Sequence, residues 1–361
     1  MVMNAAEARL KKLRAGLHAE GIDALLIASG INRKYVTGFT GTAGYVVLSA
    51  DQAWLFTDFR YMTQAAEQAP HYTVVEHEAK PFATIREALR SAGVRRLGFE
   101  QQHVSYGSYL SYGRELGESI ELVPTEGLVE RLRQIKDEDE IAVIREAIAV
   151  GDAAFQHILG FLQPGRTEQE VALELETFMR RLGASGSSFD TIVASGERSA
   201  LPHGVASDRV LGTDEFVKMD YGALYRGYCS DMTRTVVLGK PTEKHRQIYD
   251  IVLEAQETAL AGIRAGITGR EADALARDVI ERHGYGKAFG HGTGHAVGLE
   301  IHENPRLNKL DETVLEPGMI VTVEPGIYLP GFGGVRIEDI VAVTENGCDI
   351  LTRSTKQFLT L

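Results

Sequence analysis

Short apolar runs alternate with helix-like stretches along the first part of the chain. Runs of apolar and β-branched residues bounded by turn residues are typical of strands, and here they occupy 23–29, 44–50, 53–58, 72–78 and 96–100. Stretches with helical periodicity separate them. This order predicts a small α/β domain with a mixed sheet over residues 1–130.

A long amphipathic pattern follows over residues 131–162. Its apolar positions recur at helical spacing, which predicts one long helix; they are Ile141, Ile144, Ile148, Phe155 and Ile158. A chain of 361 residues exceeds what a single hydrophobic core ordinarily serves. We therefore expect this helix to open a second domain, residues 131–361.

The second domain contains a weak internal repeat. Two periodic stretches, beginning at Thr167 and at Thr268, each start with the Thr-x-x-Glu spacing of a capping box and end at a glycine. Downstream of each comes a histidine, His203 in the first copy and His302 in the second. The pattern predicts two similar halves.

Each half also places two acids after its histidine. Asp220 and Glu324 end the apolar runs VKMD and VTVE, 53 and 56 residues after the capping threonines, and Asp231 and Glu338 follow the next turn. A single acid at such a place is ordinarily a solvated turn residue. Two halves that each supply two acids and a histidine would converge on one pseudo-symmetric site.

Burial changes the interpretation of these acids. Carboxylates crowded at the ends of apolar runs are unfavourable unless a cation neutralises them. Four carboxylates with an imidazole form an oxygen-rich ligand set that suits Mn, Co, Fe or Zn. Because four acids exceed what one catalytic ion ordinarily takes, the pattern indicates two ions sharing bridging carboxylates, which is hydrolytic machinery.

Three histidines lie within the thirteen residues HGTGHAVGLEIHE, 291–303. The i, i+4 spacing of His291 and His295 would suit a zinc-binding helix, but three glycines within seven positions argue against a helix. We therefore expect a close-packed turn and strand. The spacing alone leaves open which histidine binds metal, which moves protons and which fills the core.

Composition narrows the class of partner. The formal net charge of -12 opposes non-specific binding to nucleic acid or an anionic membrane, and neither partner is expected. The N-terminal stretch carries Glu, Lys and Arg where a signal peptide would be apolar, so a cytoplasmic enzyme is the default expectation. Cys229 and Cys348 have no CxxC partner, which predicts buried thiols and no thiolate zinc site.

Several motifs together carry a family resemblance. They are MDYGALYRGYCSDMTRT (219–235), FGHGTGHAVGLEIHE (289–303), VTVEPGIY (321–328) and GVRIED (334–339), with NRKYVTGFTGTAGY (32–45) and TDFRY (57–61) nearer the N-terminus. In combination they resemble the pita-bread metallopeptidases, the family of aminopeptidase P, prolidase (Xaa-Pro dipeptidase) and creatinase. The resemblance implies an α+β chain, in which a creatinase-like α/β domain precedes a pseudo-symmetric pita-bread catalytic domain with an antiparallel sheet.

The resemblance also implies a ligand set for two divalent ions. By motif position the ligands are Asp220, Asp231, His295, Glu324 and Glu338, with Asp231 and Glu338 bridging both ions. Manganese is favoured, and cobalt or zinc can occupy the same ligands.

The implied reaction is hydrolysis of the bond before proline. A metal-bridging hydroxide attacks the carbonyl, Glu324 acts as general base, and His302 with one metal stabilises the developing oxyanion. His203 and His291 orient the residues on either side of the bond.

Two arginines complete the expected site. Arg336, two positions before Glu338, is expected to hold ligands in place. Arg306 is a candidate for binding a substrate carboxylate, and an exposed structural arginine is the alternative for it.

Competing functions follow from the same resemblance. A metal-free pita-bread binding module or a creatinase-like amidinohydrolase would not need all five ligands. Within the peptidase branch, the sequence does not separate a dipeptidase, which reads a free proline carboxylate, from an aminopeptidase that admits longer peptides. Small Xaa-Pro peptides are the expected partners, and the resemblance suggests a homodimer.

Overall fold

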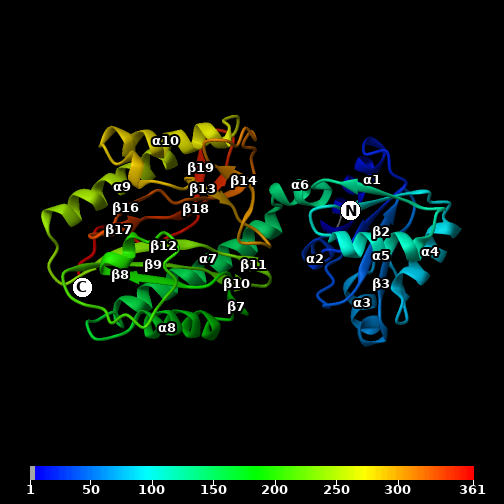
Figure 1. Ribbon diagram of the computed structural model, residues 1–361, viewed down its shortest axis with the longest axis horizontal. Coiled ribbons are helices and arrows are strands. Elements are labelled where there is room, and N and C mark those ends of the chain that lie inside the picture. Colours follow the sequence, from blue (N-terminus) through cyan, green and yellow to red (C-terminus); the bar gives the residue numbers. More distant parts are fainter. Residues whose placement is uncertain (1–4) are drawn as a thin grey trace. The chain divides into compact units, whose positions relative to one another are not determined.

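The chain folds into two compact units. The computed structural model describes residues 5–361, and the units divide between Arg133 and Gln134 (Figure 1). Helices and strands occur in both units, as the α+β expectation requires.

The N-terminal unit is built on one mixed sheet. Its strands lie in the order β4-β3-β2-β1-β5-β6, with antiparallel pairs around β2 and parallel pairs at β3–β4, β1–β5 and β5–β6. The elements are α1 (Ala5–Ala19), β1 (Ala24–Ile27), α2 (Gly30–Thr37), β2 (Tyr45–Ser49), β3 (Ala53–Thr57), η1 (Phe59–Tyr61), α3 (Met62–Gln68), β4 (Thr73–Glu76), α4 (Pro81–Ser91), β5 (Arg96–Glu100), α5 (Tyr106–Leu116), β6 (Glu121–Thr125) and α6 (Leu128–Gln134).

All five predicted strands of this unit are confirmed, and the structure adds β6. That strand contains Pro124, which cannot donate a ladder hydrogen bond and is therefore tolerated at a sheet edge. The proline also interrupts the apolar run, so the sequence pattern did not reveal the strand.

The predicted single helix over 131–162 is wrong in its first part. Helix α6 ends at Gln134 and α7 begins at Glu138, because the residues between them bond to another segment. Ile135 forms a β-bridge with Met319, and the Lys136 amide donates to the Gly318 carbonyl at 3.0 Å. Asp137 then caps α7 in a capping box with Glu140, a signal that the sequence did contain.

The C-terminal unit combines helix pairs with antiparallel sheets. Its elements are α7 (Glu138–Leu159), α8 (Glu168–Arg181), β7 (Gly186–Ser187), β8 (Ile192–Ser195), η2 (Gly196–Ala200), β9 (Glu215–Tyr221), β10 (Ala223–Tyr225), β11 (Tyr228–Cys229), β12 (Met232–Leu238), α9 (Glu243–Gly262), α10 (Gly269–Arg282), η3 (Gly286–Ala288), β13 (Gly294–Ala296), β14 (Glu303–Leu307), β15 (Ile320–Val323), β16 (Gly326–Leu329), β17 (Gly333–Arg336), β18 (Asp339–Val343) and β19 (Cys348–Ile350). Within residues 5–361, no helix is both long enough and apolar enough to cross a membrane.

The internal repeat is present in the structure. Both expected capping boxes form, at the start of α8 and of α10. The two capping residues also occupy equivalent tertiary positions: Thr167 forms a β-bridge with Val210, and Thr268 forms one with Val314. Each half therefore folds its second helix back onto the segment that leads into its acid-bearing strand.

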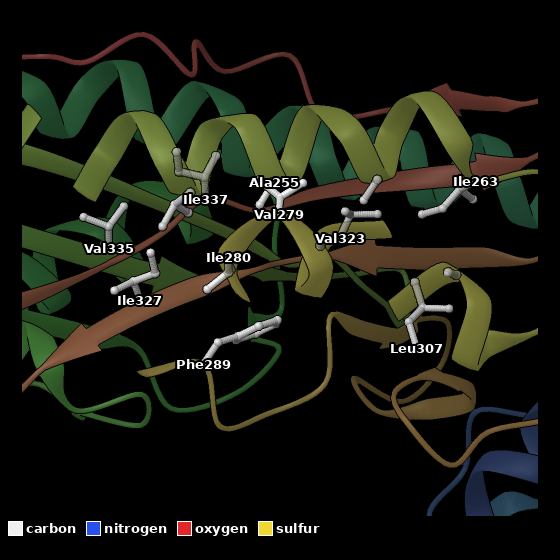
Figure 2. Close-up of a cluster of buried hydrophobic side chains, with 14 of the residues drawn as sticks. Ala255, Ile263, Val279, Ile280, Phe289, Leu307, Val323, Ile327, Val335 and Ile337 are labelled. Carbon is white, nitrogen blue, oxygen red and sulfur yellow. The ribbon is translucent and has the colours of Figure 1, made fainter. Parts of the chain in front are cut away.

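The sheets of the C-terminal unit are covered on both sides by the repeated helices (Figure 1). Helices α9 and α10 lie along one side, and α7 and α8 lie along the other. On the α9–α10 side, Ala255 and Val279 pack against strand residues such as Val323, Ile327 and Val335, all of them buried (Figure 2). Close packing of this kind makes the strands rigid. It therefore also fixes the strand ends next to which the predicted acids lie.

Helix α9 begins with an unusual capping box. The third helical residue is His245, whose Nδ1 accepts the Thr242 amide hydrogen at 3.1 Å. The ring packs against both Phe216 and Phe332. Burial lowers the pKa of His245; Asp214 has a smaller effect that raises it, and Lys244 lowers it slightly further. Only the neutral imidazole can accept this hydrogen bond.

This capping box makes part of the stability pH-dependent. Because the folded-state pKa lies below the ordinary value of 6.5, its stabilisation is present above pH 6.5 and is lost as pH falls through the folded pKa. We expect His245→Gln, whose amide can accept at any pH, to reduce the drop in melting temperature between pH 7.5 and 5.5 by about 2–4 °C if the box contributes about 1 kcal/mol. Parallel pH profiles for the two proteins would contradict this.

Candidate metal centre

One cavity of the C-terminal unit gathers the residues singled out in the sequence. It has a volume of about 590 Å³. Its walls include both halves of the repeat, and every expected site residue lines it: His203, Asp220, Asp231, His291, His295, His302, Arg306, Glu324, Arg336 and Glu338.

Strand pairing brings the four acids together. In the first half Asp220 is near the end of β9, and Asp231 directly precedes its partner strand β12, whose Met232 pairs with Tyr221. In the second half Glu324 follows β15, and Glu338 directly precedes its partner strand β18, whose Asp339 pairs with Val323. Each antiparallel pair therefore presents two carboxylates at one end.

A pair of hydrogen bonds joins the two halves at the acids. The Glu338 amide donates to the Thr233 carbonyl at 3.1 Å, and the Thr233 hydroxyl donates to Glu338 Oε2 at 2.8 Å. Thr233 is itself the β12 residue that pairs with Asp220. The relative placement of the two acid pairs is therefore fixed by the backbone.

His295 is positioned on β13 as a nitrogen donor. Its Nε2 lies 3.5 Å from Asp231 Oδ2 and 3.4 Å from Glu324 Oε1. Its Nδ1 lies 3.1 Å from the Ala296 carbonyl, which favours the tautomer with the proton on Nδ1 and the lone pair on Nε2. Burial lowers the pKa of His295 to about 3, so the ring is neutral.

The strand that carries His295 is packed without spare room. An added Cβ at Gly294 would lie 2.0 Å from the Thr322 carbonyl oxygen, and one at Gly292 would lie 2.7 Å from the Leu307 carbonyl oxygen. A Cβ at Gly298 would lie 2.7 Å from the Glu303 carboxylate. The expected turn and strand in place of a helix are thus confirmed, and the glycines permit the close approach.

The acid cluster is short of positive charge. Burial, followed by repulsion from neighbouring carboxylates, raises the pKa of Asp231 and of Glu338 well above the ordinary range. Burial also raises the pKa of Glu324 to about 7, although Arg336 opposes the shift. Repulsion of this kind marks a site built for a cation.

Unpaired ligand atoms give an independent test of that conclusion. Asp220 Oδ1 and Glu338 Oε1 are buried and have no hydrogen-bond partner. Ligand atoms of Asp231, His295 and Glu338 lie within 4.8 Å of one another. Buried carboxylate oxygens without donors, next to a neutral imidazole, fit a divalent metal.

Arg336 connects several parts of the site. It forms an ion pair with Asp220, donates to the Thr233 hydroxyl at 2.9 Å and donates to the Tyr328 hydroxyl at 2.9 Å. Its Nε lies 3.8 Å from Glu324 Oε2. The guanidinium therefore orients two of the acids, as its place beside Glu338 in the sequence suggested.

Tyr328 was not predicted as a site residue. Its hydroxyl lies 2.7 Å from His291 Nε2, and His291 Nδ1 lies 2.8 Å from the Gly292 carbonyl. Burial lowers the pKa of His291 to about 4, which fits a neutral ring that accepts from the tyrosine. Tyr328 ends the motif VTVEPGIY, so it stood within a recognisable site motif. The sequence does not show that its hydroxyl contacts His291, which is why its role was not predicted.

The remaining predicted residues lie nearer the opening. His203 and His302 are exposed, and Arg306 on β14 is half-buried. His302 contacts the edge of the His295 ring at a centroid distance of 4.5 Å. Arg306 pairs with His295 across the strands. Lining residues that the sequence analysis missed are Phe189, Asp190, Ile192, Val205, Ile301 and Asn308.

Comparison with known proteins agrees with this geometry. Residues 142–345 match the model of metallopeptidase family M24, and residues 9–135 match the creatinase/prolidase N-terminal domain. A curated relative, an Xaa-Pro dipeptidase of Pyrococcus furiosus, is 42% identical over 97% of this chain and 99% of its own length.

Two solved structures extend the similarity to the fold. A structure of an Xaa-Pro dipeptidase from Bacillus anthracis has a TM-score of 0.97 and 52% identity, covering 99% of this chain and 100% of that one. An X-Pro aminopeptidase from Thermotoga maritima has a TM-score of 0.90 and 37% identity, covering 96% and 100%. The expected pita-bread architecture is confirmed, and the chain is a divalent-metal-dependent hydrolase that belongs to metallopeptidase family M24 and carries a creatinase/prolidase N-terminal domain.

Proposed function

We propose that this protein hydrolyses the peptide bond before proline, with Xaa-Pro dipeptides as its main substrates. The observation that carries the proposal is a cluster of buried carboxylates, two of which have an oxygen without a hydrogen-bond partner, in the same cavity as a half-buried arginine, Arg306. Within residues 5–361, no carboxylate lies within ion-pair distance of the Arg306 guanidinium. The names of the P. furiosus and B. anthracis relatives support the dipeptide substrate.

We assign the metal ligands as Asp220, Asp231, His295, Glu324 and Glu338, for two divalent ions. Manganese is the proposed ion, with cobalt and zinc as alternatives compatible with the same ligands. When bound, the ions supply Lewis-acid polarisation of the scissile carbonyl and acidify the attacking water. A metal-free binding module is not favoured, because these buried acids would then repel one another without compensation.

The protein's own groups then bind the substrate and move protons. Glu324 accepts the proton of the attacking water at a carboxylate oxygen and passes it to the leaving proline nitrogen. His302, exposed at the opening and in contact with His295, donates a hydrogen bond to the developing oxyanion. His203 and His291 orient the two residues of the substrate, and Arg306 binds the proline carboxylate.

A second candidate activity is removal of the N-terminal residue from longer Xaa-Pro peptides. The similarity to the T. maritima X-Pro aminopeptidase supports it, as does a cavity of about 590 Å³. A cytoplasmic location remains part of the proposal, and the family resemblance suggests a homodimer, which sedimentation of the purified protein tests.

The deciding experiment compares Ala-Pro with Ala-Pro-Ala. Purified protein is stripped with a chelator and restored with Mn²⁺ or Co²⁺. We expect activity to vanish on stripping, to return with metal and to favour the dipeptide. Preferred cleavage of the tripeptide would establish the aminopeptidase, and cleavage of neither peptide by metal-loaded protein would refute the proposed function.

Arg306 provides a test of substrate selection. We expect Arg306→Gln to raise KM for Ala-Pro by about 10–100-fold, because one charge-assisted hydrogen-bonding partner of the carboxylate is lost. Cleavage of the amidated peptide Ala-Pro-NH₂, which lacks that charge, should change little. Equal losses on both peptides would assign Arg306 a structural role instead.

Asp231 provides a test of the ligand assignment that does not rely on activity. Asp231→Asn should lose bound Mn²⁺, measured by elemental analysis, and lose more activity than the about 10–100-fold typical of residues behind the ligands. In metal-free protein the same change removes a carboxyl group whose charged form is disfavoured by burial and by the neighbouring carboxylates. It should therefore raise the melting temperature by about 2–4 °C per 1 kcal/mol of repulsion relieved, whereas a lower metal-free melting temperature would contradict the charge argument.

A further inference from the structure

Lys218 is a fully buried lysine of the C-terminal unit. It lies on β9, and its exposed fraction is 0%. Within the described part of the chain, its amino group forms no ion pair with a carboxylate. A buried amino group is unfavourable unless other polar atoms satisfy it, so its actual partners indicate what the residue does.

Those partners belong to the turn that carries His203. Lys218 Nζ donates to the Leu201 carbonyl at 2.6 Å and reaches the Pro202 carbonyl at 3.3 Å. It also lies 5.0 Å from the centre of the Tyr328 ring. The two carbonyls immediately precede His203 in the chain, so the amino group holds the backbone from which the imidazole projects.

The turn is tied to its surroundings differently on the two sides of His203. On the C-terminal side, Val205 forms a β-bridge with Ile192, and its carbonyl accepts a hydrogen bond from Arg198 at 2.8 Å. On the N-terminal side, Leu201 is 47% exposed, and its amide donates to the Arg198 carbonyl at 2.9 Å. Besides Lys218, the buried Arg336 bonds the Pro202 carbonyl at 3.0 Å. These two cations connect the residues just before His203 to the sheet.

The two cations differ in what else they contact. Arg336 also bonds Asp220 and Tyr328, so its loss would disturb a proposed ligand and His291 together. Among residues 5–361, the Lys218 amino group bonds the two turn carbonyls alone, and it faces the Tyr328 ring. Lys218 is therefore the residue whose removal acts selectively on the turn.

We propose that Lys218 is a positioning residue for His203: its hydrogen bonds fix the Leu201–Pro202 backbone in the position from which the His203 imidazole reaches the substrate. The proposal rests on the proposed peptidase function, in which His203 orients the substrate. It does not depend on the charge of Lys218, because an amino group donates hydrogen bonds in either protonation state.

A double-mutant cycle separates positioning from general stability. Lys218→Met keeps a side chain of similar length and removes the donor. We expect it to raise KM for Ala-Pro about tenfold, the effect of about one hydrogen bond, with kcat changed less than about threefold and bound Mn²⁺ unchanged. In a His203→Ala background, Lys218→Met should have almost no further effect, because residues that act through one another are not additive.

Two further measurements keep the inference testable. Hydrogen exchange in a peptide covering residues 201–206 should be faster in Lys218→Met than in the parent protein and unchanged in His203→Ala. Lys218→Gln, which keeps one donor, should show an intermediate KM, and it replaces Lys218→Met in the cycle if the methionine variant does not fold.

The outcomes are distinct. Additive effects of the Lys218 and His203 substitutions, an unchanged KM, or unchanged exchange at 201–206 would each overturn the positioning role while leaving the peptidase function intact. If the parent protein cleaves no Xaa-Pro peptide, the proposed function fails, and the inference about KM fails with it.

Discussion

Repulsion among buried carboxylates is the constraint on which this structure depends. Asp231 and Glu338 are 6% and 1% exposed, and burial and mutual repulsion both disfavour their charged forms. The surrounding chain nevertheless fixes their places: Thr233 bonds Glu338, and Asp231 directly precedes β12, which is paired with β9. A cation that joins like charges held together in this way removes their repulsion and stabilises the fold. Metal binding is therefore coupled to the stability of the domain as well as to chemistry.

The internal repeat explains how such a cluster can be built. Each half contributes an antiparallel strand pair whose end carries two acids, and each pair is backed by its own two helices. The halves are alike in backbone but differ in donors: the imidazole His295 comes from the second half alone. Symmetry of the scaffold thus accommodates asymmetry in the proposed ligand set, in which the first half supplies only oxygen and the second half supplies both oxygen and nitrogen.

The sequence predicted features that repeat along the chain or match a motif, and it missed those that depend on tertiary contacts. The capping boxes at Thr167 and Thr268 and the five apolar strands have local signals. The expected site residues all line one cavity. They could be chosen from the sequence because their motifs occur together in one chain. Tyr328 and Lys218 were missed because a hydroxyl or an amino group within an apolar run does not reveal its partner. The break before α7 was missed because Ile135 leaves helical geometry to pair with Met319, which is far away in sequence.

The close-packed glycines around His295 leave the residues near this histidine less free to vary than the exposed residues that line the same cavity. At Gly292, Gly294 and Gly298 any side chain would collide with backbone or carboxylate atoms, so related sequences and laboratory libraries alike should retain glycine there. Val205 and Ile301 also line the cavity but retain solvent-accessible surface. Changes in the preferred Xaa residue can therefore accumulate along that rim while the metal-binding floor stays constant, which makes the rim the place to redesign selectivity.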